Sequence, residues 1–391
     1  MVIIFKRVLK DFSLPMIYTS ALLCVIYALP QLKLKGAAEL CFAFLLPLFA
    51  VYFNLKSFKR GAAAGFSVFA ADLIFFALSG IHFSIVFSAF AAVVTVYGFK
   101  RLRFEYAAVC AFLLSCTVSL ALGTVYPYMY LILKEFTPFL AARGALFGAF
   151  NNFYSLFVSD SLSELVYHTS YSKAVLTESG IKSGVMNSLS SRDAAQLLAG
   201  KYFVNISLTA GAFAALYKKV GGRERTALIS VCALALVFGD VRLLGLYLIL
   251  YNPALYIAYL PAAFLSYLTA SLLDLRIGFK ENGSLIELFK YGEKWGYFII
   301  SAFVIGVLTY FLFRLVFSKF EINRGRYYPK NVRRILSALG GEDNIERIEK
   351  GILYVRNPNL IDVLRLDCEI EQNRVTLFPD ELGVLSDYFS V

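Results

Sequence analysis

The stretch WGYFIISAFVIGVLTYFLFRLVF, residues Trp295–Phe317, decides the fold class of this chain. It contains a single charged residue, and about 20 predominantly apolar residues are enough for a helix to cross a bilayer. Similar apolar runs recur along most of the chain before it, separated by short basic segments. The sequence therefore predicts an all-α polytopic membrane protein.

Composition supports this prediction. Of 391 residues, 59% are hydrophobic and 17% are charged, against about 45–50% and 25% in soluble domains. A soluble globular body, a disordered chain and a disulfide scaffold are excluded. We expect about ten transmembrane helices, with re-entrant segments in addition, near Phe12–Leu29, Ala37–Phe53, Gly61–Leu78, His82–Phe99, Tyr106–Leu133, Phe139–Val158, Tyr202–Tyr217, Ala227–Leu250, Ala254–Leu273 and Trp295–Phe317.

The net charge of +11 is explained by membrane topology and does not indicate nucleic-acid binding. Lys and Arg collect in short cytoplasmic loops, and here they cluster in Lys56–Arg60, Lys100–Arg103 and Lys218–Arg225. The basic start of the first run lacks a following small-residue cleavage site, so we interpret it as a retained first helix. The expected location is a cell membrane crossed several times, with the N-terminus and the tail on the cytoplasmic side.

Two polar intervals interrupt the apolar pattern. Ser159–Lys201, which holds His168, is either an external loop or irregular backbone that lines a cavity. Lys280–Lys294, which holds Glu287, is either a surface loop or a broken segment of the kind that marks a transporter's substrate site.

Ionisable residues inside the apolar runs are costly and therefore informative. They are Asp72, Asp240 and Arg242. On a continuous helix Asp240 and Arg242 point about 200° apart, whereas on irregular backbone both reach one cavity. His82 is interpreted as an interfacial structural residue, and no metal or cofactor motif stands out, so no cofactor is expected.

After Phe317 the chain changes character and becomes weakly acidic. We expect a membrane domain over residues 1–320, a linker over 321–328 and a small C-terminal α+β domain over 329–391. In that domain the pattern predicts helices over Tyr327–Leu339 and Glu381–Phe389, with strands over Ile352–Val355 and Val375–Phe378.

The order of residues from Leu198 onward resembles the membrane component, enzyme IIC, of bacterial sugar phosphotransferase systems of the glucose/N-acetylglucosamine/maltose superfamily. Ala199-Gly200-Lys201-Tyr202-Phe203 is similar to the family's "AGKFP". Gly239 followed by Asn252-Pro253-Ala254-Leu255-Tyr256 keeps the spacing of its "GITEP…APLLY" segment. Arg276-Ile277-Gly278-Phe279 resembles its "RIGF".

The tail adds a second resemblance. Ile335-Leu336-Ser337-Ala338-Leu339-Gly340-Gly341, followed by Asn344-Ile345, is similar to the "LLxALGGxxNI" opening of the enzyme IIB domain. The phosphate-accepting Cys of that domain falls on Gly351, which has no nucleophile, and Arg356 alone remains of its Arg pair. The resemblance therefore implies a degenerate enzyme IIB-like domain.

In the membrane part the family's substrate Glu falls on Arg242, and its His-His pair falls on Asp160 and Ser161. The resemblance implies a sugar site that includes Asn151, Asp160, His168, Arg242 and Glu287. We hypothesise that Arg242 and Asp160 meet across this cavity. The resemblance further implies a homodimer.

Three functions are consistent with the sequence. The first is a sugar permease of the enzyme IIBC type that takes up sugar at the expense of phosphoenolpyruvate. The second is a divergent paralogue without phosphotransfer that acts as a solute facilitator or sensor. The third is an unrelated transporter or lipid-handling protein. Separate enzyme IIA and IIB proteins are the partners that would restore phosphotransfer in the first case.

Gly351 generates the first testable prediction. Incubation with phosphorelay proteins and labelled phosphoenolpyruvate should leave residues 321–391 unlabelled, because Gly351 cannot accept a phosphoryl group. Mass spectrometry of the tail peptides measures this. Stable phosphate on Cys368 would contradict the prediction, because it would reveal a relocated acceptor.

Overall fold

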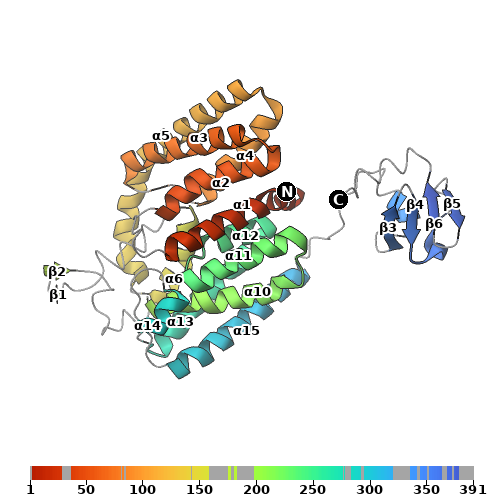
Figure 1. Cartoon of the computed structure of the whole chain (residues 1–391). Helices are drawn as coiled ribbons and strands as arrows, with labels where there is room; N and C mark the ends of the chain where they lie inside the picture. The colour runs from red at the N-terminus through yellow and green to blue at the C-terminus, as the bar shows by residue number, and fades with distance from the viewer. Residues whose placement is uncertain are drawn as a thin grey trace. The chain divides into compact units, whose positions relative to one another are not determined.

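The computed structural model describes residues 2–28, 37–80, 82, 85–141, 143–157, 175–177, 180–182, 198–275, 277, 283–291, 295–319, 335–340, 344–349, 352–362, 368–371 and 374–377. The chain divides into two compact units, Met1–Glu321 and Ile322–Val391. The first unit is mostly helical (Figure 1).

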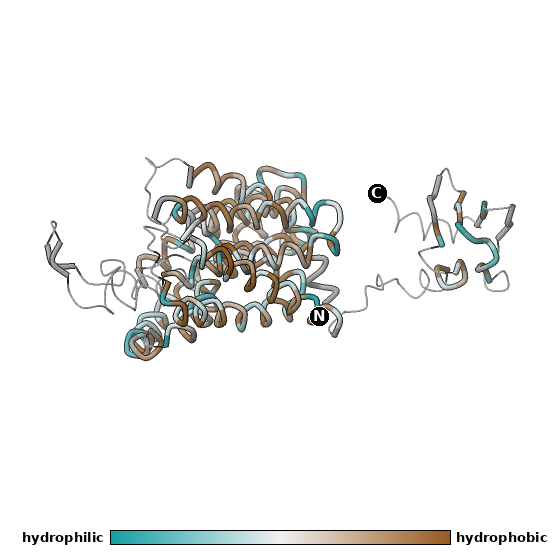
Figure 2. Tube along the Cα trace, turned by 90° about the horizontal axis from the view of Figure 1, so that it is seen from below, coloured by the Kyte–Doolittle hydropathy of each residue, from teal (hydrophilic) through white to brown (hydrophobic). Residues whose placement is uncertain are grey.

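Five helices among the described residues are long and apolar enough to cross a membrane. They contain Asp11–Ala28, Phe58–Ser79, Phe104–Thr137, Pro253–Leu272 and Gly296–Ser318. Figure 2 shows apolar residues along the helices and hydrophilic ones gathered mainly near their ends. The chain is thus a multi-pass, membrane-embedded protein, while the expectation of ten spans goes beyond these five helices.

The first half of the unit is a bundle of five helices. They are α1 (Val2–Ala28), α2 (Ala37–Leu55), α3 (Phe58–Ser79), α4 (Ile85–Arg101) and α5 (Phe104–Ala141). Gly61 and Gly65 allow α3 to approach α2 closely, because a Cβ atom on either would lie within 3 Å of an α2 carbonyl oxygen. Small residues at such contacts are typical of helix packing in membranes.

The second half begins with α6 (Gly144–Phe157) and a small hairpin of β1 (Val175–Thr177) and β2 (Gly180–Lys182). It continues with α9 (Gly200–Tyr202), the π-helix η4 (Phe203–Leu208), α10 (Thr209–Tyr217), α11 (Gly222–Phe238), α12 (Arg242–Tyr251), α13 (Pro253–Leu272), α14 (Leu285–Tyr291) and α15 (Trp295–Lys319). Most predicted spans therefore correspond to one helix.

Two of the predicted spans differ from the helices in the structure. The single span predicted over Ala227–Leu250 is wrong, because α11 ends at Phe238 and α12 begins at Arg242. The Tyr247 hydroxyl donates to the Glu224 carbonyl at 3.2 Å, so α12 folds back along α11 as a hairpin. In addition, Phe139 belongs to α5 and does not start the next span.

Contacts between helix ends define one basic face of the first unit. Asn54 Nδ2 donates to the Asp11 carbonyl at 3.2 Å, which places the end of α2 beside the first half of α1. Arg60 Nη1 donates to the Phe99 carbonyl at 3.4 Å. The α2–α3 and α4–α5 junctions, both rich in Lys and Arg, therefore lie at the same end as the start of α1.

Helices of the second half also have ends at the basic face. The Tyr27 and Phe238 rings stack with centroids 5.7 Å apart, so the ends of α1 and α11 meet and the start of α11 lies at the basic face. Lys219 Nζ lies 6.0 Å from the centre of the Phe317 ring, which places the end of α15 there too. Figure 1 shows the start of α1 and the end of α15 on the same side of this unit.

The second unit contains a four-stranded antiparallel sheet with the order β3-β4-β6-β5. Its strands are β3 (Ile345–Glu349), β4 (Ile352–Val355), β5 (Cys368–Glu371) and β6 (Arg374–Leu377). The strand predicted over Ile352–Val355 matches β4, and β6 overlaps the second predicted strand. The linker, most of the helix predicted over Tyr327–Leu339 and the helix predicted over Glu381–Phe389 lie outside the described residues.

Membrane topology is the second testable prediction. Because the start of α1 and the end of α15 lie at one basic face, tags fused to the two chain ends should be accessible from the same side of the membrane, the cytoplasmic side by the positive-inside rule. Protease protection in oriented vesicles measures this. Accessibility of the two tags from opposite sides would contradict the arrangement.

Candidate functional site

The break between α11 and α12 is the main irregularity of the membrane unit. Gly239 ends α11 with φ of 76°, a left-handed conformation that favours glycine. Its N–H donates to the Ala235 carbonyl at 3.0 Å, which closes the last turn. Asp240 and Val241 connect the two helices, so the hairpin tip presents a carboxylate immediately before α12.

The Asp240 carboxylate stabilises the start of α12 in two ways. Its Oδ1 accepts the backbone N–H of Arg242 at 3.1 Å, which satisfies a helix N–H that has no partner within α12. The same carboxylate forms a bidentate ion pair with the Arg242 guanidinium, Nε to Oδ1 at 3.0 Å and Nη2 to Oδ2 at 2.9 Å. Such fork-to-fork pairs are among the stronger polar interactions in proteins.

The ion pair also contacts α1 and α2, in the first half of the unit. The Tyr27 hydroxyl, at the end of α1, donates to Asp240 Oδ2 at 3.0 Å. The Arg242 guanidinium carbon lies 5.0 Å from the centre of the Phe42 ring on α2, within range of a cation–π contact. Only 9% of the Arg242 side chain and 3% of the Asp240 side chain are exposed, so both charges depend on these partners.

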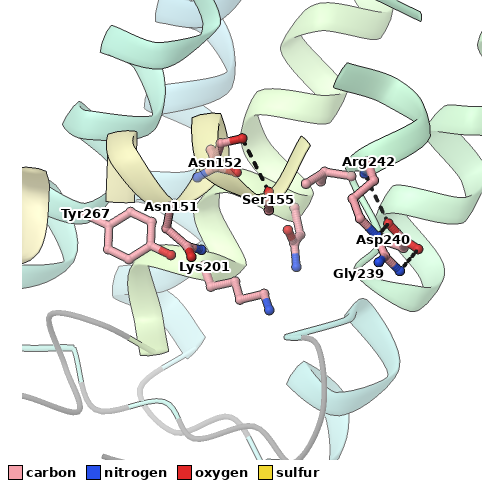
Figure 3. A pocket seen from close by; sticks show the side chains of 10 residues that line it. Asn151, Asn152, Ser155, Lys201, Gly239, Asp240, Arg242 and Tyr267 are labelled. Carbon is pink, nitrogen blue, oxygen red and sulfur yellow. Dashed lines mark hydrogen bonds and ion pairs between the residues drawn. The ribbon is translucent and has the colours of Figure 1, made fainter. Parts of the chain in front are cut away.

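A polar pocket lies beside the hairpin tip. Figure 3 shows side chains from α6, α9, α13 and the hairpin converging on it. Its described lining consists of Asn151, Asn152, Ser155, Lys201, Asn205, Gly239, Asp240, Val241, Arg242 and Tyr267. The cavity measures about 30 Å³, which is room for about one water molecule. A larger solute requires the walls to separate.

α6 supplies three of the polar side chains from one face. Asn151, Asn152 and Ser155 follow the spacing that places residues on neighbouring turns. The Asn152 side chain donates to the Gly148 carbonyl at 2.8 Å, and the Asn152 carbonyl accepts the Tyr256 hydroxyl of α13 at 3.0 Å. The first bond stays within α6, and the second connects α6 to α13.

The π-helix η4 contributes Asn205 to the lining of the pocket. Single π turns inside α-helices occur frequently at functional sites. Asn205 lies within this turn and donates from Nδ2 to the Gly283 carbonyl at 3.0 Å, which connects η4 to the segment before α14. Lys201 lies one turn earlier and directs its side chain into the pocket (Figure 3).

Two glycines leave room for the Tyr267 ring, which also lines the pocket. A Cβ atom on Gly148 of α6 or on Gly200 of α9 would overlap this ring. The ring is completely buried, and it reaches the pocket between the two helix backbones. Glycine is required at both positions because any side chain would displace the ring.

The structure brings together two of the predicted site residues, Asn151 and Arg242. Asp160 and His168 lie outside the described residues, so the hypothesised contact of Arg242 with Asp160 is untested, and the described carboxylate partner of Arg242 is Asp240. Glu287 has a different role. Its Oε2 accepts the N–H of Gly283 at 2.8 Å and that of Ser284 at 3.2 Å, while the Ser284 hydroxyl accepts the Glu287 N–H at 3.1 Å.

This reciprocal pattern is a capping box at the start of α14. Glu287 therefore fixes the end of a short helix, and it is not among the described residues that line the pocket. In the tail, Gly351 lies outside the described residues. Arg356 follows β4, and its backbone N–H donates to the Asn344 carbonyl at 2.8 Å.

Sequence reasoning did not single out Asn152, Ser155, Lys201, Asn205 or Tyr267 as site residues. For α6 the signal was present, since adjacent Asn residues and a Ser one turn later are unusual in an apolar helix. For Tyr267 no local signal exists, because its position depends on Gly148 and Gly200, which are distant in the sequence. No family model matches the chain, and no curated protein matches it.

The ion pair generates the third testable prediction. Arg242→Leu should lower the free energy of unfolding by about 3–5 kcal/mol, because it leaves the Asp240 charge buried without its cation. Asp240→Asn should cost a similar amount. The double variant should lose clearly less than the sum of the two, since neither charge then remains.

Denaturant unfolding in detergent measures these free energies. Ser230→Ala serves as the control, because the half-buried Ser230 of α11 makes an exposed hydrogen bond within its own helix, to the Thr226 carbonyl. Strict additivity of Arg242→Leu and Asp240→Asn would show that the two side chains do not act as a pair.

Proposed function

We propose that this chain is a membrane permease of the enzyme IIC type, which binds and moves a sugar or a sugar-like solute. The observation that carries the proposal is the polar pocket at the α11–α12 hairpin tip, inside an otherwise apolar helical unit. Interrupted helices that surround a polar site are typical of transporters, where irregular backbone is tolerated only if it lines a cavity.

The sequence resemblance supports the same site. It assigns Asn151, on α6, and Arg242, at the hairpin tip, to the family's sugar site, and both residues line the pocket. Lys201 and Gly239, which also line it, belong to segments that resemble the family. Residues from distant parts of the sequence thus gather where the resemblance expects one site.

The chemistry of the walls suits a polyol. Each sugar hydroxyl both donates and accepts a hydrogen bond, and amides offer both functions in one side chain. The pocket has three amides in Asn151, Asn152 and Asn205, with hydroxyls in Ser155 and Tyr267. The Asp240–Arg242 pair adds oriented donors and acceptors at little net charge, because each member neutralises the other.

Movement of the hairpin tip is the step that admits the solute in this proposal. A cavity of about 30 Å³ is far smaller than the roughly 300 Å³ of ordinary ligand pockets. Gly239 lies at the junction where a change of backbone angles would swing the tip, and Tyr27 and Phe42 hold the tip in its closed position.

The tail determines whether transport can be driven by phosphorylation of the solute. With Gly351 at the acceptor position, the chain's own tail does not phosphorylate the solute, so phosphotransfer would need separate enzyme IIA and IIB proteins. A divergent facilitator or sensor without phosphotransfer is the second candidate, and the same position favours it. A homodimer in a bacterial inner membrane, with the tail in the cytoplasm, completes the proposal.

Sugar exchange is the fourth testable prediction. Proteoliposomes preloaded with unlabelled glucose, N-acetylglucosamine or maltose should take up the same labelled sugar by counterflow. Asn151→Ala should weaken apparent affinity about fivefold, as expected for the loss of one hydrogen bond of about 1 kcal/mol. Thr117→Ala, at an exposed position of α5 that bonds only the Leu113 carbonyl, should leave exchange unchanged.

The outcomes separate the candidates. Exchange without phosphorylated product supports the facilitator, and exchange that yields sugar phosphate only when separate enzyme IIA and IIB proteins are added supports the permease of the phosphotransferase type. Saturable binding without exchange supports the sensor. Absence of both binding and exchange for all three sugars would contradict the proposal.

A further inference from the structure

A second buried ionisable pair lies in the first half of the membrane unit, apart from the pocket. Asp72, on α3, is completely buried within a helix long enough to span the membrane. Its Oδ2 lies 2.9 Å from Nδ1 of His82, ten residues later. The His82 side chain is 15% exposed, so the pair extends from the interior of the bundle to its edge.

Local geometry holds His82 in this position. Gly80 ends α3 with φ of 77°, and its N–H donates to the Phe76 carbonyl, so the chain reverses direction after the helix. The His82 ring then stacks on the Phe76 ring at 4.5 Å and 11°. The imidazole thus lies flat on α3, with one nitrogen directed back to Asp72.

This pair differs chemically from Asp240–Arg242. A guanidinium keeps its proton under all ordinary conditions, so Asp240–Arg242 carries fixed charges. Histidine is the side chain that changes charge between about pH 5 and pH 8. The Asp72–His82 pair can therefore hold one proton more or one fewer, and Asp, Glu and His inside membrane helices form proton relays in pumps and transporters.

Among the described residues, the helices packed on α3 carry few titratable side chains along the half that contains Asp72. On α2 there is Cys41, one turn before Phe44, whose ring contacts Phe69; the Glu39 side chain lies outside the described set. On α4 the first two turns contain none. On α5 the candidates are Cys116, Tyr126 and Tyr130, while its charged residues lie nearer its ends, at Glu105, Lys134 and Glu135. On α3 itself the charges are at its start, Lys59 and Arg60.

Through α5, the helix that carries Asp72 is connected to the helix that carries the pocket wall. Ala71 and Phe75, which flank Asp72 on α3, pack with Tyr126 of α5 in one buried cluster. The Tyr126 hydroxyl lies 3.5 Å from the Tyr154 hydroxyl of α6. Tyr154 is adjacent to Ser155 and follows Asn151 and Asn152, so the same helix carries the pocket wall.

We propose that Asp72 and His82 form a proton-binding site that couples solute movement to one proton. This inference rests on the proposed function, because it requires a solute to be moved. It supplies a driving force that the tail does not, since Gly351 cannot accept the phosphoryl group that would trap the sugar. The pair lies at the end of α3 opposite the basic face, on the outer side by the positive-inside rule.

One proton is bound and one is released for each solute moved. A proton from the outer solution binds the imidazole, and the pair changes from a net charge of −1 to 0. The neutral pair moves with the loaded α6 wall, and the proton leaves toward the opposite side after the solute. At one proton for each solute, a gradient of one pH unit supports about tenfold accumulation.

The first test measures proton binding without any solute. The chain contains two histidines, so ¹⁵N-histidine NMR of the full chain in nanodiscs gives two resolvable titrations, assigned with His82→Gln. Asp72→Asn should shift the titration of His82 and leave that of His168 in place. A His82 titration that does not respond to Asp72→Asn would overturn the pair as a proton site.

The second test measures coupling. In proteoliposomes with an inward proton gradient, the sugar that exchanges in counterflow should accumulate, and the external pH should rise with each addition of it. Asp72→Asn and His82→Gln should abolish accumulation but retain counterflow, because exchange needs no driving force. Ser67→Ala, which removes a buried hydrogen bond to the Ala63 carbonyl in the same helix, is the matched control and should still accumulate sugar.

The outcomes distinguish this inference from the proposed function. Counterflow in the wild type without gradient-driven accumulation overturns proton coupling and leaves the permease standing. Absence of counterflow for every sugar overturns both. Accumulation that persists in Asp72→Asn and His82→Gln assigns coupling to other residues and overturns the role of this pair.

Discussion

The ion pair between Asp240 and Arg242 is the interaction on which the membrane unit depends. Together with the left-handed Gly239, it stabilises a break in the run from Ala227 to Leu250, whose hydropathy alone suits one continuous span. The Asp240 carboxylate caps α12, neutralises Arg242 and accepts the Tyr27 hydroxyl. One buried pair thus stabilises the hairpin, directs its tip to α1 and α2, and places polar groups beside α6.

Sequence patterns predicted most helices of the membrane unit because lipid imposes a simple rule: a segment that spans must be apolar and must satisfy its own backbone. That rule does not predict the position at which a helix breaks. Gly239 followed by Asp240 was the available signal, a helix-ending glycine before a capping carboxylate, but the surrounding leucines outweighed it. In the tail, β4 was predicted because Ile352–Val355 is a short apolar run, whereas β3 and β5 are rich in charged residues and stand out less from the surrounding polar chain.

The candidate site was harder to predict because it depends on contacts between distant residues. Asn151 and Arg242 were found through the family resemblance, and Glu287 was assigned to the site although its carboxylate caps α14. Tyr267 reaches the pocket only because Gly148 and Gly200 leave room for its ring. The Asp72–His82 contact depends in the same way on one left-handed residue, Gly80, and neither helical nor strand periodicity encodes it.

We propose that the tip of the α11–α12 hairpin is a water-accessible solute site inside the membrane unit. Thiol reactivity of Val241→Cys, in a chain whose six native cysteines are replaced by serine, tests this most directly. The account predicts modification by a small water-soluble thiol reagent and slower modification when the exchanging sugar is present. It also predicts little reaction for Leu265→Cys, on the exposed apolar face of α13. Equal, sugar-independent rates at the two positions would contradict it.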